Sequence, residues 1–293
     1  MILKNALPQF IECMQRWEKR PTRAQFESEY AVPMQEVVGD FFEDFYSALT
    51  SIEREYGWAR YREHALGLDA KREWQRLEDQ FQGVERLLET SLTGEAILLG
   101  TFATMDGYAR FDRGTHRVFL GVDESYANGR YVDILMAHEL THAARESQPT
   151  VWEGFGLSVN MTQDEFTDSQ PVIEHLAGEG FSCFVSETLN PGEPAHFYAY
   201  QDEKSLEIIR QNAAAVDRVV HATIQSSTLP YYALYDTSRY GRQMPSYAHY
   251  VWAWQWIKSL CAKSYRGSPK DMLRVSSNEW IDSALSFRLA DTL

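Results

Sequence analysis

The stretch YVDILMAHELTHAARE occupies residues 131–146 and contains the motif HELTH at residues 138–142. Apolar residues recur in it at the spacing of one buried helix face, so we predict a helix over this range. His138 and His142 are four residues apart, which places both imidazoles on one face, one turn apart. Glu139 follows the first histidine and would flank an ion held by the pair. This arrangement is typical of a zinc site at which Glu139 acts as general base on water.

Two histidines leave a catalytic zinc site incomplete, because such sites usually have three protein ligands and one open position. We expect the third ligand to be Glu179, on a helix predicted to follow Pro171. Glu174 on the same helix and Glu153 in a predicted loop are the alternatives. A connector followed by a second helix can return a side chain to the ion from a rigid support, which favours Glu179.

The rest of the chain is mainly helical in pattern. Residues 22–91 carry apolar and aromatic residues at helical spacing, with charged outer faces. Further helices are predicted after Pro171 to about residue 189, over about 200–225 and over about 247–262, while residues 147–170 and 229–245 are predicted connectors. Short strands are predicted at residues 96–99 and 117–122, with turns at Asp106-Gly107, at residues 112–114 and at Asn128-Gly129.

These elements predict an α+β fold that is predominantly helical, with a small sheet beside the 131–146 helix. The character of the sequence changes near Thr93-Gly94. We therefore predict a helical N-terminal region of residues 1–93 and a catalytic domain of residues 94–293.

Charge, cysteine spacing and the N-terminal residues indicate which partners, cross-links and cell compartment to expect. The net charge of −14 disfavours binding to nucleic acid and to an anionic membrane surface. The three cysteines are far apart and show no CxxC spacing, which predicts neither disulfides nor a cysteine zinc site. Glu12, Arg16 and Glu18 interrupt the apolar run that a signal peptide would need, so we expect a cytoplasmic protein.

The motif at residues 138–142, together with Glu179-Gly180-Phe181-Ser182, resembles the gluzincin metallopeptidases. In this thermolysin-like group, HExxH is followed by a glutamate ligand on a downstream helix. Within the group the chain is most similar to uncharacterised bacterial predicted zinc-dependent proteases. The resemblance covers about residues 95–260 and implies a zincin-like core, a Zn²⁺ cofactor and a peptide or protein substrate.

The resemblance also implies a late tyrosine or histidine that donates a proton to the oxyanion. The segment PSYAHY at residues 245–250 is similar to a late Pro-x-Tyr segment of those proteins, and Tyr247 is the first candidate. His249 and Tyr240 are the next candidates.

The chain departs from the family pattern at two places. No Gly-x-Met-x-Asn segment precedes the 131–146 helix, which disfavours the aminopeptidase subgroup. Cys183 stands one turn after Glu179, where thermolysin-like enzymes have a carboxylate that orients a ligand histidine. We expect Cys183 to be a small buried residue and an aspartate or glutamate from elsewhere to orient the histidine.

The sequence thus predicts a zinc peptidase with His138, His142 and Glu179 as ligands, Glu139 as base and Tyr247 as proton donor. A zinc-dependent hydrolase of a small molecule and a non-catalytic zincin-fold binding protein are the alternatives. Retention of Glu139 argues against the latter, because a structural site needs ligands alone. The strand at residues 117–122 is predicted either to pair with an extended peptide or to be an ordinary sheet strand.

Overall fold

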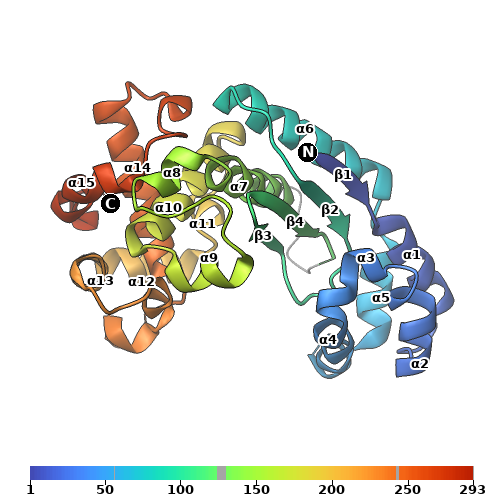
Figure 1. Ribbon diagram of the computed structural model, residues 1–293. Helices are drawn as coiled ribbons and strands as arrows, with labels where there is room; N and C mark the ends of the chain where they lie inside the picture. The colour runs from blue at the N-terminus through green and yellow to red at the C-terminus, as the bar shows by residue number, and fades with distance from the viewer. Residues whose placement is uncertain (56, 124–129, 242–243, 293) are drawn as a thin grey trace.

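The computed structural model describes residues 1–55, 57–123, 130–241 and 244–292 (Figure 1). The turn predicted at Asn128-Gly129 lies outside these residues. The described chain is predominantly helical with one small mixed sheet, which confirms the predicted α+β class.

The α-helices are α1 (Leu7–Arg16), α2 (Arg23–Phe26), α3 (Gln35–Val38), α4 (Phe42–Glu55), α5 (Trp58–Leu66), α6 (Ala70–Leu88), α7 (Arg130–Glu146), α8 (Pro149–Glu153), α9 (Gln163–Ser169), α10 (Val172–Leu189), α11 (Ala195–Tyr198), α12 (Glu203–Gln211), α13 (Ala213–Gln225), α14 (Ala248–Ser264) and α15 (Ile281–Ser286).

The sheet has the strand order β1-β2-β4-β3. Its strands are β1 (Ile2–Asn5), β2 (Glu95–Leu99), β3 (Gly107–Asp112) and β4 (Thr115–Gly121). β1 and β4 both run parallel to β2, and β3 pairs with β4 in a hairpin. The predictions of β2, β4 and the turn between β3 and β4 are confirmed.

The two faces of the sheet are covered by different parts of the chain. His116 of β4 contacts Glu146 of α7, and α7 packs against β3 and β4 on that face. Phe119, whose side chain points to the opposite face by the alternation of a strand, packs against Phe41 at a ring distance of 4.9 Å. The second half of β4 is therefore buried on both sides, which explains its apolar run at residues 118–120.

The N-terminal region contributes to the same sheet. β1 pairs in register with β2, with Leu3 opposite Ala96, and thus joins residues on both sides of the predicted boundary near residue 93. The hydroxyl of Tyr30 donates a hydrogen bond to the carbonyl of Gly100 at 2.9 Å. The sheet and its core cross that boundary, and the division into residues 1–93 and 94–293 stays a prediction.

Helix α10 packs against both α7 and α14, and these three helices hold the candidate site (Figure 1). A Cβ atom on Gly180 would lie 2.3 Å from the carbonyl oxygen of Ala253 on α14. The absent side chain therefore permits the close approach of α10 to α14.

β1 and β3 were not predicted, and two further stretches differ from the predicted secondary structure. The predicted loop at residues 147–170 contains α8 and α9. α9 begins with a capping box in which Thr162 and Glu165 exchange hydrogen bonds, a signal that the sequence carries. The long helix predicted over residues 200–225 is two helices, α12 and α13, which meet at Asn212. Among the described helices, none combines the length and the apolar character needed to cross a bilayer.

Candidate metal centre

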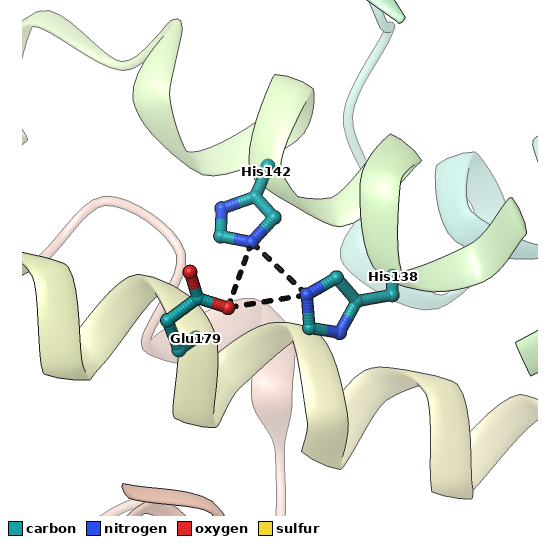
Figure 2. Close-up of side chains that lie close together, drawn as sticks. All are labelled: His138, His142 and Glu179. Atoms are coloured by element: carbon teal, nitrogen blue, oxygen red, sulfur yellow. Dashed lines mark hydrogen bonds and ion pairs between the residues drawn. The ribbon is translucent and has the colours of Figure 1, made fainter. Parts of the chain in front are cut away.

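Three buried or half-buried side chains from α7 and α10 converge at one point (Figure 2). The Nε2 atoms of His138 and His142 lie 3.1 Å apart. One carboxylate oxygen of Glu179 lies 3.2 Å from the first and 3.3 Å from the second. Within the part of the chain that the structure describes, this His-His-Glu group is the one set of three or more side chains able to hold a metal ion.

The triangle has the dimensions of a tetrahedral site. Nitrogen and oxygen ligands about 2.0–2.1 Å from a zinc ion lie about 3.3–3.4 Å apart at tetrahedral angles. The three atoms thus leave room for one ion just above their plane. His138 also lines a cavity of about 780 Å³, so the site adjoins open space in which a reactant can approach.

The structure brings Glu179 to the histidines, as predicted, and does not bring the two alternative carboxylates there. Glu153 is exposed at the end of α8. Glu174 forms a buried, two-pronged ion pair with Arg145, with both N–O distances at 2.8 Å. Glu174 faces away from the histidines although it lies on the same helix as Glu179.

Glu146 orients the second histidine, a role that the sequence interpretation left unassigned. Its carboxylate lies 3.0 Å from Nδ1 of His142 and 3.0 Å from Nε2 of His116. Burial would raise the pKa of Glu146, but hydrogen bonds from His116 and His142 outweigh it and hold the pKa at about 2. Glu146 follows His142 by one helical turn, and this i, i+4 spacing is the sequence signal that identifies it.

Replacing Glu146 by glutamine is expected to weaken metal binding about 10–100-fold, because an amide supports the histidine less strongly than a carboxylate does. Competition with a chromophoric chelator measures the affinity. The matched control is Glu153→Gln, at an exposed carboxylate. Equal affinities in the two variants would show that Glu146 does not support the ligand.

His138 has a different support. Its Nδ1 atom faces the thiol of Cys183 at 3.8 Å. Cys183 is fully buried, as expected, and burial raises the pKa of its thiol well above the usual range. A neutral thiol is a weak hydrogen-bonding partner, so the two histidines are oriented by groups of very different strength.

Glu139 lies at the cavity wall next to His138. It is 9% exposed and lines the cavity with Gly107 at the start of β3. A Cβ atom on Gly107 would lie 2.7 Å from the side chain of Glu139, so the glycine makes room for this carboxylate. Burial raises the pKa of Glu139 to about 8, and the nearby carboxylate of Glu179 adds to the rise. A dication at the triangle would favour the ionised form and lower this pKa.

The three residues considered as proton donors lie in different surroundings. Tyr247 is 43% exposed and lines the cavity, immediately before α14. His249 is buried against the rings of His175 and Tyr235, and it is not among the residues that line the cavity. The hydroxyl of Tyr240 donates to the backbone carbonyl of Leu234 at 2.7 Å. Of the three, Tyr247 lines the cavity, and its role stays a prediction.

Two tyrosines that the sequence analysis did not name, Tyr250 and Tyr200, have their rings against His138. The ring of Tyr250 stacks parallel to His138 at 6.4 Å, and its hydroxyl forms a hydrogen bond with the hydroxyl of Tyr235 at 3.2 Å. Burial and the negative charge of Glu179 raise the pKa of the Tyr250 hydroxyl well above its usual range. Tyr200 presents its ring edge-on to His138 at 4.8 Å and lines the cavity. Its hydroxyl is buried and has no hydrogen-bond partner among the described residues, which leaves it available to a ligand.

The strand predicted to pair with a peptide does not have a free edge. Residues 117–121 belong to β4, which pairs with β2 on one side and β3 on the other. The pairing prediction is therefore wrong for this strand, and its alternative, an ordinary sheet strand, is confirmed. The two edge strands are β1 and β3, and of these β3 begins at Gly107 beside Glu139.

No protein-family model, no curated protein and no solved structure matches this chain.

Proposed function

We propose that this protein is a zinc-dependent hydrolase that cleaves peptide bonds. The observation that carries the proposal is the triangle of His138, His142 and Glu179 beside the carboxylate of Glu139 in a cavity. Two imidazoles and one carboxylate form a ligand set common to catalytic zinc sites. The helix-borne third ligand also supports the resemblance to gluzincins and a zincin-like core.

Each nearby residue has a role under this proposal. A zinc ion held by the three ligands would supply Lewis-acid chemistry, by making water more acidic and polarising a carbonyl. Glu139 accepts the proton of the attacking water and passes it to the leaving amine. The hydroxyls of Tyr200, Tyr247 and Tyr250 are candidates to donate a hydrogen bond to the oxyanion. Tyr200 has the strongest support, because its buried hydroxyl has no other partner among the described residues.

A peptide substrate is favoured over a small ester or amide by the position of β3. This outer strand begins at the cavity wall, where its backbone can pair with an extended chain. Glu139 and the adjoining cavity argue against a purely structural zinc site, in which a fourth protein ligand would close the shell.

We also propose that the protein acts in the cytoplasm. Its three cysteines, Cys13, Cys183 and Cys261, are all free and buried. Free thiols are typical of a reducing compartment.

Metal removal tests the proposed activity. The purified protein is expected to contain about one zinc ion per chain and to cleave members of a randomised peptide library. A chelator is expected to abolish cleavage, and added Zn²⁺ to restore it. Zinc-dependent turnover of a panel of small esters and amides, with every peptide left intact, would contradict a peptidase and support the small-molecule alternative.

A further inference from the structure

A second cavity of about 610 Å³ lies between α4 and the residues that precede β3. It shares Thr104, Met105 and Gly107 with the cavity at the metal centre. Gly107 also packs on Glu139. The two cavities are therefore neighbours that meet beside the proposed base, and the N-terminal helices form one wall of the second.

The segment that separates the cavities is held in a fixed shape. Phe102 and Ala103 have left-handed backbone conformations, with φ values of 54° and 53°, which are unfavourable for residues other than glycine. The buried carboxylate of Asp123 stabilises this turn by accepting hydrogen bonds from the backbone N–H groups of Thr101 at 2.6 Å and Ala103 at 3.1 Å. Strained backbone that the surroundings hold in place often marks a functional site.

The second cavity has an apolar floor and a polar rim. The floor includes Phe45 and Phe102, whose rings lie 5.9 Å apart. The rim includes Asp44, Ser47 and Ser51, which repeat at the spacing of one face of α4. An apolar side chain can be buried on this floor while a main chain passes the polar rim.

We infer that the α4 cavity is a substrate subsite and that the substrate is an extended peptide reaching both cavities. This inference rests on the proposed function. Each cavity alone has the size of a small-molecule site, about 300–1,000 Å³, and the pair offers more room than a dipeptide needs. Tyr108, on the outer strand β3, lines the second cavity, so the strand that can pair with a peptide adjoins both.

Peptide length tests the inference. A decapeptide that the zinc-loaded protein cleaves, about 33 Å long when extended, is truncated step by step from each end. Truncation from one end is expected to lower kcat/KM about tenfold at the step that empties the α4 cavity. Ser51→Trp, which fills this cavity, should remove the advantage of the longer peptide. We therefore expect the kcat/KM of the decapeptide, divided by that of the truncated peptide, to fall by a similar factor in this variant.

Controls separate this effect from misfolding and from failure of the proposed function. Ser47→Trp places the bulky ring on the exposed rim and should have the same direction of effect. Thr50→Trp, at an exposed α4 residue outside the cavity lining, should leave the ratio unchanged. Cleavage that is independent of peptide length, or an equal loss for both peptides in Ser51→Trp, would overturn the inference.

If the wild-type protein cleaves no peptide, the proposed activity fails, and binding then decides the subsite. Fluorescence anisotropy of labelled random decapeptides on the zinc-loaded Glu139→Gln protein should show binding that Ser51→Trp weakens about tenfold. If the peptides do not bind, or if they bind equally well after Ser51→Trp is introduced, the assignment of the subsite is overturned as well.

Discussion

Replacing Glu139 by glutamine is expected to lower kcat for peptide hydrolysis about 10²–10⁴-fold and to leave zinc bound. Glutamine has nearly the same shape as glutamate but cannot accept the proton of the attacking water. The structure places this side chain on the cavity wall and leaves it out of the ligand triangle, so the variant should keep all three ligands. Steady-state kinetics together with zinc analysis of the same sample separates the two effects.

The control for this substitution is Glu153→Gln, because Glu153 is exposed and lies apart from the ligand triangle. Its kinetics should match those of the wild type. A Glu139→Gln protein with full zinc content and full activity would show that Glu139 is not the base.

Glu179→Ala is expected to weaken zinc binding by more than the 10–100-fold expected for Glu146→Gln. Glu179→Ala removes a metal ligand, whereas Glu146→Gln only weakens the hydrogen bond that orients the ligand His142. Peptide hydrolysis should be lost in parallel. Isothermal calorimetry and chelator competition measure the affinity. Thermal unfolding of the metal-free proteins shows whether the loss of the carboxylate also changes the stability of the fold.

Glu187→Ala is the matched control, since Glu187 lies two turns further along α10 and pairs with Lys258 at 2.8 Å. It should bind zinc as tightly as the wild type does. If Glu179→Ala also binds zinc with wild-type affinity, Glu179 is not the third ligand, and the carboxylate from α10 has no role at the metal.

The local part of the site could be predicted from the sequence. His138 and His142 lie on one helix, so their separation is fixed by the helical repeat and needs no knowledge of the tertiary structure. Glu146 obeys the same rule and was missed although it follows His142 by one turn. Glu179 required the further assumption that a second helix packs against the first, and the structure confirms that α10 packs on α7.

The remaining parts depend on contacts between segments far apart in sequence. β1 has four residues and pairs with β2 about 90 residues later, so no local pattern indicates its partner. β3 was not among the predicted strands, because only the turn residues at its two ends were recognised and its six residues carry no apolar run. The positions of Tyr200 and Tyr250 beside His138 follow from how their segments pack on α7 and α10, which residue spacing does not encode.

The measurement that most directly tests the metal centre is anomalous diffraction at the zinc edge from crystals of the zinc-loaded protein. We predict one peak about 2.0–2.2 Å from Nε2 of His138, Nε2 of His142 and a carboxylate oxygen of Glu179, with a non-protein ligand in the fourth position. A peak elsewhere, no peak in the triangle, or a fourth protein ligand closing the coordination shell would contradict a catalytic centre here.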